Sequence, residues 1–270
     1  MTDTAASALS PHVLLERVLE TAPSIVSAIE AGEIETVYQP QFSLPEDRLI
    51  GAEALVRWQH PDLGTLGAAT LFAVSAEQAA MTSLSRHIAE TALDELNRWP
   101  LPLRLSLNVL PEEVAAADFA ASFLDLVARS RVEPSRLTVE ITEDVLLGDL
   151  PGAALNLLAL RDAGLRTALD DFGAGFCNFR YLKVLPLDYL KLDRSMIDGI
   201  ATDPRDRAVL RGIVAMASAL GLRVIAEGIE QDVQRDVVLS EGCDSYQGFL
   251  RSAPISAASF RQLALAQTAF

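Results

Sequence analysis

Cysteine, histidine and aromatic residues are scarce in this sequence, and each scarcity excludes a class of protein. The 270 residues include two cysteines and three histidines, and aromatic residues make up 6% of the chain. Cys177 and Cys243 are too few for a disulfide framework, so we expect reduced thiols in a cytoplasmic protein. Three scattered histidines offer no cluster of the kind that binds zinc.

Long apolar runs and an excess of positive charge are also missing. No apolar stretch is long enough to span a bilayer, and residues 1–11 lack the basic region and apolar core of a signal peptide. The formal net charge is −15. Because acidic surfaces repel phosphate backbones, we expect no membrane and no nucleic acid polymer as a partner. The charge either serves solubility alone or lets an acidic pocket bind an anionic ligand through divalent cations.

Apolar residues make up 50% of the chain, and their spacing predicts strands that alternate with helices. We expect residues 1–10 to form a flexible tail and residues 11–270 to form one domain. The alternating order and about eight strands favour a TIM-like (β/α)8 barrel, with 35–42 and 49–58 as a hairpin. The other predicted strands are 103–109, 137–142, 165–170, 187–193, 222–228 and 243–248, and the main helices are 11–31, 69–99, 112–130, 151–163, 207–221 and 256–268.

Nearly every predicted strand delivers a polar side chain near its carboxyl end, and in a parallel barrel these ends share the mouth where barrel enzymes work. Carboxylate and amide oxygens suit Mg²⁺ or Mn²⁺ better than zinc. Asp170 and Asp171 would repel each other, and two cations roughly 4 Å apart would remove this repulsion and support displacement at phosphorus. Lys191 could orient the attacking water. The residues concerned are Glu53, Asn108, Glu140, Asp170, Asp171, Lys191, Glu227 and Gln247.

Each of these residues also has an ordinary structural interpretation. A lone glutamate in a strand is more often salt-bridged, and adjacent aspartates before a glycine more often cap a turn. Lys191 could lie on the outward face of an alternating strand. Independent accidents would not all fall at the same end of successive strands, so the whole set favours a site.

The motifs around these residues resemble those of the EAL family of cyclic di-GMP phosphodiesterases. The segment EALVRWQHP (53–61) contains the Glu-Ala-Leu triplet that gives the family its name. Eight motifs in the family's order cover about residues 25 to 265, which is a specific pattern. The other seven are YQPQF (38–42), SLNV (106–109), VEITED (139–144), LDDFGAG (169–175), YLKLD (189–193), IAEGIE (225–230) and YQGFL (246–250).

The resemblance implies a barrel with one antiparallel strand, and hydrolysis of cyclic di-GMP to linear pGpG with two Mg²⁺ or Mn²⁺ ions. It implies that Lys191 contacts the attacking water, that Glu230 and Gln247 support water and metal, and that Glu143 tethers the loop after 169–171. The metal ligands implied are Glu53, Asn108, Glu140, Asp170, Asp171 and Glu227, with Glu53 also counted as catalytic. The substrate contacts implied are Gln39, Leu55, Arg57, Asp171 and Gln247.

The loop 171–179, DFGAGFCNF, departs from the family pattern, which commonly has Thr at Ala174, Tyr at Phe176 and a serine pair at 177–178. The loop lies near the family's usual homodimer contact. Its departures are therefore expected to affect the rate of turnover and the coupling between the two protomers. An alternative is therefore an inactive receptor that binds cyclic di-GMP and signals to a regulatory protein partner. A third reading, an enolate-forming lyase with a carboxylate-bound Mg²⁺, has no reason to reproduce the motif order.

Overall fold

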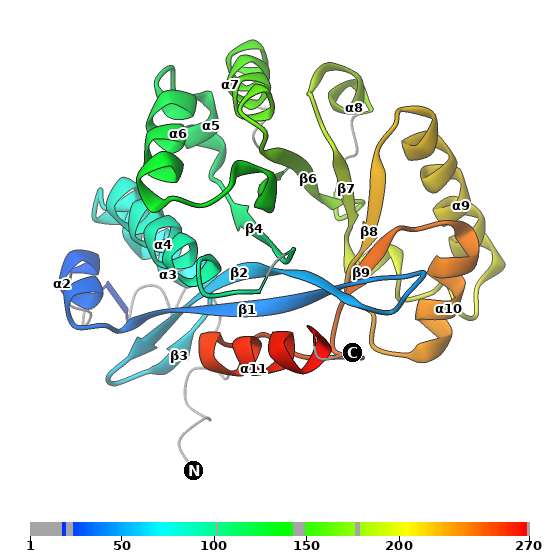
Figure 1. Ribbon diagram of the computed structural model, residues 1–270, viewed down its shortest axis with the longest axis horizontal. Helices are drawn as coiled ribbons and strands as arrows, with labels where there is room; N and C mark the ends of the chain where they lie inside the picture. Colours follow the sequence, from blue (N-terminus) through cyan, green and yellow to red (C-terminus); the bar gives the residue numbers. More distant parts are fainter. Residues whose placement is uncertain (1–17, 20–23, 101, 143–148, 176–178, 269–270) are drawn as a thin grey trace.

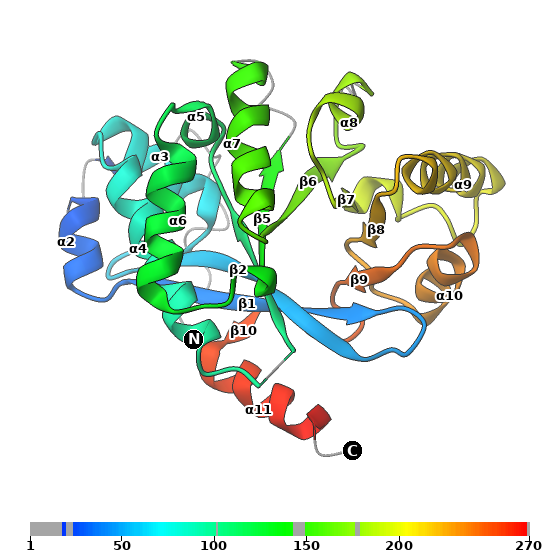
Figure 2. The same ribbon diagram turned by 45° about the horizontal axis from the view of Figure 1, so that its top comes forward.

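A closed barrel of strands, surrounded by helices, forms the body of the molecule (Figure 1 and Figure 2). The computed structural model describes residues 18–19, 24–100, 102–142, 149–175 and 179–268. The predicted tail 1–10 and Glu143 lie outside these ranges, as do residues 176–178 of the altered loop. The TIM-like barrel predicted from the alternating elements is confirmed.

The barrel closes through one antiparallel strand. Strand β1 (Ile34–Ser43) runs antiparallel to β2 (Leu49–His60) on one side and to β9 (Ser245–Gln247) on the other. Among the eight strands that close the barrel, every neighbouring pair from β2 through β9 is parallel, which confirms the expected single reversal. The five strands between β2 and β9 are β4 (Arg104–Asn108), β5 (Leu137–Thr142), β6 (Arg166–Phe172), β7 (Tyr189–Leu192) and β8 (Arg223–Ala226).

Two short strands that the sequence pattern did not predict extend the barrel wall. Strand β3 (Gly64–Leu66) pairs with the far end of β2, and β10 (Ile255–Ser256) pairs with β1. Both are too short to show an alternating pattern, and both owe their pairing to the long partner strand beside them.

The long helix predicted over 69–99 is wrong, because the structure divides it into α3 (Ala68–Glu77) and α4 (Met81–Leu96). Ala79 between them has a φ of 50°. A residue in this left-handed region cannot continue a right-handed helix, and neither glycine nor proline announces the break in the sequence. The helix predicted over 112–130 is likewise two helices, α5 (Pro111–Ala115) and α6 (Phe119–Ser130), separated by the extended Ala116.

The remaining helices follow the predicted order and cover the outside of the barrel (Figure 1). Helix α2 is the part of the helix expected over 11–31 whose bounds the structure describes in full. Its N-cap is Ser24, whose side chain accepts a hydrogen bond from the backbone N–H of Ser27. The short α8 was not predicted. The bounds are α2 (Ile25–Glu30), α7 (Leu150–Asp162), α8 (Arg180–Val184), α9 (Pro204–Ala219), α10 (Asp232–Glu241) and α11 (Ala257–Thr268).

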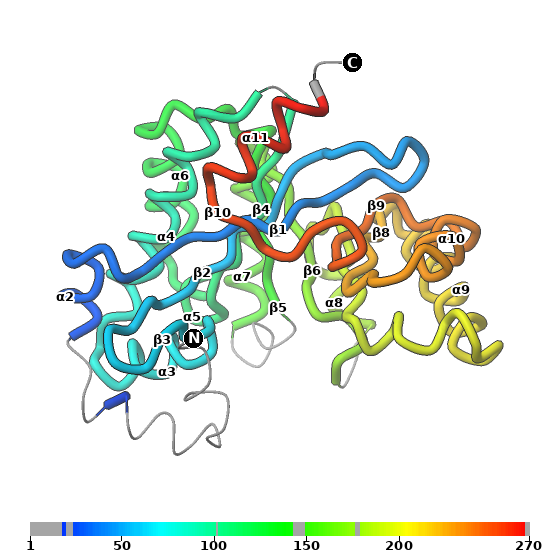
Figure 3. The backbone as a smooth tube through the Cα atoms, turned by 90° about the horizontal axis from the view of Figure 1, so that it is seen from below, coloured from blue at the N-terminus to red at the C-terminus, as the bar shows by residue number. Residues whose placement is uncertain are grey.

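Helix α11 lies along the outside of β1 (Figure 3). The ring of Phe260 packs with its centroid 4.3 Å from that of Trp99 and 6.1 Å from that of Tyr38. Such aromatic packing favours a fixed position for the helix against the wall. Among the described residues, the structure contains no helix with the length and apolar character needed to cross a membrane.

Alternation along the strands separates a packed outer face from a polar interior. On β7, Leu190 and Leu192 are fully buried beneath the helices and belong to the main apolar core. Tyr189 and Lys191 therefore face the barrel axis, because successive side chains of a strand point to opposite faces. The same rule applies to each parallel strand, and it brings their inward polar residues together at the mouth.

Candidate active site

Strand β6 carries both aspartates of the sequence LDDFGAG to the mouth of the barrel. The strand continues to the buried Phe172, two residues beyond the predicted end, and its register with β7 shifts between Leu169 and Phe172. Asp171 sits in this irregularity with a φ of 54°, and its backbone N–H donates to Asp170 Oδ1 at 2.9 Å. A bulge of this kind redirects a side chain, so two adjacent carboxylates can serve one site.

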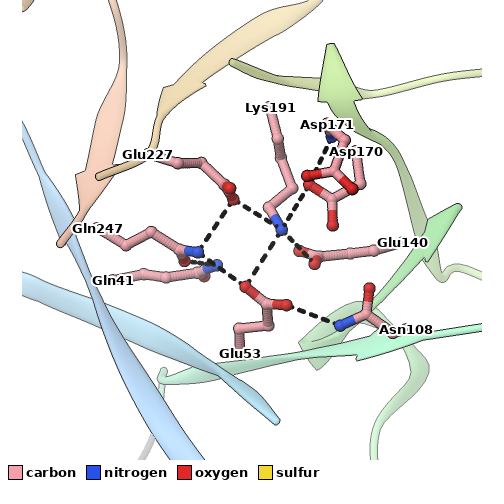
Figure 4. A network of polar contacts seen from close by, with 9 residues as sticks. All are labelled: Gln41, Glu53, Asn108, Glu140, Asp170, Asp171, Lys191, Glu227 and Gln247. Atoms are coloured by element: carbon pink, nitrogen blue, oxygen red, sulfur yellow. Dashed lines mark hydrogen bonds and ion pairs between the residues drawn. The ribbon is translucent and has the colours of Figure 1, made fainter. Parts of the chain in front are cut away.

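Lys191 lies at the centre of the mouth and is fully buried (Figure 4). Its Nζ is 2.6 Å from a carboxylate oxygen of Glu140 and 2.8 Å from one of Glu227. Asp170 and Glu53 follow at 2.9 Å and 3.2 Å. The outward position that alternation also allowed for this lysine is therefore wrong, because the side chain points into the barrel.

Amide side chains hold Glu53 in place from two directions. Asn108 Nδ2 donates to Glu53 Oε1 at 2.7 Å, and Gln247 Nε2 donates to Glu53 Oε2 at 2.7 Å. Gln247 Nε2 also lies 3.0 Å from Glu227 Oε1, and Gln41 Nε2 donates to Gln247 Oε1 at 3.0 Å. Sequence reasoning missed Gln41, although it shares the inward face of β1 with Gln39 and could have been found from that spacing.

Burial and crowding set the protonation of this cluster. Burial raises the pKa of Glu140, of Asp170 and of Glu227, the last to about 8, although Lys191 works in the opposite direction on each. The pKa of Glu53 is lowered, because the Lys191 charge and the hydrogen bonds from Gln247, Asn108 and Lys191 outweigh its burial. Burial alone would lower the pKa of Lys191, but the surrounding carboxylates raise it well above its usual range. Without cations, the cluster therefore retains protons at neutral pH.

The donor set fits hard divalent cations. Two groups of carboxylates, each with oxygens within 4.8 Å of one another, share Asp170: Glu53 and Glu140 complete one, and Asp171 and Glu227 the other. Glu140 Oε1 is buried and, within the described part of the chain, has no hydrogen-bond partner. An unsatisfied buried carboxylate oxygen is costly unless something binds it, and Mg²⁺ and Mn²⁺ prefer oxygen ligands.

The remaining predicted residues are distributed around this cluster. Gln39 Nε2 donates to the Ser252 carbonyl at 2.6 Å, and Arg57 Nη1 to the Val56 carbonyl at 2.8 Å. Leu55 and Asn108 line a cavity of about 710 Å³ beside the mouth. The substrate contacts predicted for Gln39, Leu55 and Arg57 stay predictions.

Glu230 is not brought into the cluster. Its carboxylate forms an ion pair with Arg194 Nη1 at 2.8 Å, and the glutamate is exposed. Arg194 lies just after β7 and was not among the predicted residues. No local sequence pattern connects it with Glu230, which follows thirty-six residues later in the chain. The supporting role predicted for Glu230 stays a prediction.

Metal-free protein is expected to lose stability as the pH rises from about 5 to about 8. The pKa of Glu227 is about 8 against an ordinary value of 4.5, so over this range the folded state binds more protons than the unfolded state. Stability then falls with rising pH, because ionising the buried carboxyl favours unfolding. Urea unfolding in EDTA should show this slope, and Glu227→Gln should reduce it. A flat profile in the parent protein would contradict the protonated cluster.

Comparisons with known proteins agree with this geometry. The EAL domain model matches residues 23–254. The cyclic di-GMP phosphodiesterases PA2567 and RocR of Pseudomonas aeruginosa are 35% and 34% identical to the chain, which is covered to 89% and 88%. The chain spans only 42% and 61% of the length of these two relatives.

Solved structures give the same result. The EAL enzyme Bd1971, in its cAMP- and cyclic-di-GMP-bound form, superposes with a TM-score of 0.85 at 27% identity, over 96% of this chain and 71% of the other. The PaMucR phosphodiesterase in complex with c-di-GMP gives a TM-score of 0.81 at 30% identity, over 91% and 99%. The family match covers most of the chain and includes the strands that carry the Lys191 cluster. The chain belongs to the EAL domain family.

Proposed function

We propose that the chain hydrolyses one phosphodiester bond of cyclic di-GMP to give linear pGpG, assisted by two Mg²⁺ or Mn²⁺ ions at the barrel mouth. The observation that carries the proposal is the pair of carboxylate groups that share Asp170. The relatives named cyclic di-GMP phosphodiesterases and the neighbouring structures with bound c-di-GMP support this substrate.

The charge of the mouth calls for two divalent cations. Five carboxylates and one ammonium carry a formal charge of −4 when all are ionised, which two divalent cations would balance. Bound there, the cations would supply the Lewis acidity that activates water and stabilises charge developing on phosphate oxygens. The residues that would hold them are the side-chain amide oxygen of Asn108 and the carboxylates of Glu53, Glu140, Asp170, Asp171 and Glu227.

The chain's own groups would position the reactants. The Lys191 ammonium, with three donors on a buried stem, would orient the attacking water and stabilise negative charge. Gln247 would keep Glu53 and Glu227 in place through the two hydrogen bonds it already donates. Arg57 would contact a substrate phosphate, and Leu55 and Gln39 would border a guanine base.

The receptor alternative remains a second candidate because of Ala174, which replaces a threonine common in the family.

The homodimer through the side of loop 171–179 also remains a proposal. The side chain of Val184, the last residue of α8, is 45% exposed. Phe179, which directly precedes this helix, is 54% exposed. Exposed apolar side chains in one place are typical of an interaction surface. We therefore propose that this surface meets a second copy of the chain.

A chromatographic time course tests the activity. Purified protein with cyclic di-GMP and Mn²⁺ or Mg²⁺ is expected to produce pGpG, and EDTA is expected to stop the reaction, because the mouth loses the cations that balance its carboxylates. Binding of cyclic di-GMP without product would favour the receptor. Product formation that EDTA does not affect would contradict the role given to the cations.

A further inference from the structure

Three arginines face the interior of the barrel at the end opposite the mouth. Arg104, Arg166 and Arg223 are the first residues of β4, β6 and β8, and we call them the floor arginines. Each stands four residues before a side chain of the mouth, namely Asn108, Asp170 and Glu227. Residues an even number of positions apart on a strand share a face, so the floor arginines point inward like the mouth residues. At the usual rise per residue, four positions place them roughly 13 Å below the mouth.

Tyr189 connects the floor arginines. Arg104 Nη1 donates to the Tyr189 hydroxyl at 2.9 Å, and the guanidinium carbon of Arg223 lies 5.9 Å from the centroid of its ring. Tyr189 also packs inside the barrel against Ala168, which is the next inward residue of β6 above Arg166. Two of the three positive side chains therefore contact one buried aromatic ring, and the third begins the strand whose Ala168 packs against that ring.

None of the floor arginines has an ion-pair partner in the part of the chain that the structure describes, and Arg166 Nε is buried there without a hydrogen-bond partner. The nearest carboxylates along the strands are engaged elsewhere. Asp188 accepts the backbone N–H of Thr167, and Asp244 accepts that of Val224.

Such an arrangement is unfavourable for a chain with a net charge of −15, which has many carboxylates available for pairing. Arg223 is exposed and Arg104 and Arg166 are half-buried, so solvent partly screens their mutual repulsion, but the buried Nε–H of Arg166 without an acceptor costs its lost hydration. Both costs disappear if an anion with several acceptor oxygens occupies the floor.

We propose that the floor arginines and Tyr189 form a binding site for a phosphate group. Guanidinium forks match the geometry of phosphate oxygens and bind them with two hydrogen bonds at a time. The Tyr189 hydroxyl accepts from Arg104 and so keeps its own hydrogen free to donate to an oxyanion. The ligand is inorganic phosphate or the phosphomonoester of a small metabolite, and the site is independent of the activity proposed for the mouth.

Calorimetric titration with inorganic phosphate tests the site. EDTA is present throughout, so that cations at the mouth cannot recruit the phosphate. The parent protein is expected to bind one phosphate saturably, and Arg166→Gln is expected to weaken binding about tenfold or more, because the variant loses charge-assisted hydrogen bonds to the phosphate. The exposed Arg205→Gln and the mouth variant Arg57→Gln should bind like the parent. Absence of saturable binding, or loss of binding in Arg57→Gln alone, would overturn the proposal.

Thermal unfolding of Arg223→Gln gives a second readout that does not depend on the half-buried Arg166. Without phosphate, this variant is expected to melt at or above the temperature of the parent, because one repelling charge is gone. With saturating phosphate, it is expected to melt below the parent, because the ligand has lost a contact. An arginine with a purely structural role would lower the melting temperature equally under both conditions, which would also overturn the proposal. Titration with ribose 5-phosphate then shows whether a phosphomonoester or free phosphate binds more tightly.

Discussion

Glu140→Gln is expected to lower kcat/KM for cyclic di-GMP by about a hundredfold or more, while the metal-free protein unfolds at nearly the parent's temperature. Glutamine keeps the shape of the side chain but removes a charge that the cations need, and their stabilisation of the transition state is worth several kcal/mol. Burial raises the pKa of Glu140 well above its usual range, which favours the neutral form of the side chain when cations are absent. Glutamine resembles that neutral form.

Two measurements together make this prediction specific. Steady-state hydrolysis with saturating Mn²⁺ should show the loss of activity, and thermal unfolding in EDTA should show that the fold is retained. Glu112→Gln on the exposed part of α5 is a matched control, since it makes the same chemical change away from the mouth. A Glu140→Gln protein that hydrolyses within about tenfold of the parent would contradict its role as a ligand.

The barrel and the polar mouth could be predicted because both depend on local patterns. Alternation along a strand fixes which side chains face inward, and parallel strands end at the same rim. The sequence pattern alone therefore places Lys191, Glu140 and Asp170 together. Only the contact distances, with Lys191 between four carboxylates, needed the three-dimensional arrangement.

The failures have physical reasons that a local pattern does not contain. Ala79 breaks a helix because its backbone adopts a positive φ, a conformation that alanine does not prefer and that its identity therefore does not announce. Strand β6 continues past both aspartates because Phe172 is buried against its neighbours. The ion pair of Glu230 with Arg194 joins two segments far apart in the chain, which local spacing cannot reveal either, and the role predicted for Glu230 stays a prediction.

The floor of the barrel shows a different reason why a site cannot be predicted from sequence. Arg104, Arg166 and Arg223 each look like an ordinary charged residue at the start of a strand, and the sequence alone gave no reason to connect them. Strand position places all three at the same end of the barrel, and Tyr189 contacts two of them, Arg104 and Arg223. A positive floor and a negative mouth thus occupy opposite ends of the same interior.

Lys191→Met is expected to reduce the free energy of unfolding of the metal-free protein by about 3 to 5 kcal/mol at pH 8.5, which is the usual cost of removing one partner from a buried ion pair. Methionine preserves the length and apolar stem of the side chain but leaves the carboxylates around it without their counter-charge. Urea unfolding in EDTA measures the loss. Lys183→Met, on the exposed side of α8, is the matched control and should unfold like the parent.

The loss should depend on pH and on cations in directions that an ordinary packing defect would not produce. As the pH falls from 8.5 towards 5, the carboxylates of the variant become protonated and the difference from the parent should shrink, because neutral groups no longer need the ammonium. Saturating Mn²⁺ should also restore stability, since cations that bind only the folded state favour it by mass action. A difference between variant and parent that stays constant with pH and Mn²⁺ would mean that Lys191 acts through its apolar stem. Such a result would remove the electrostatic basis on which the two-cation mouth is proposed.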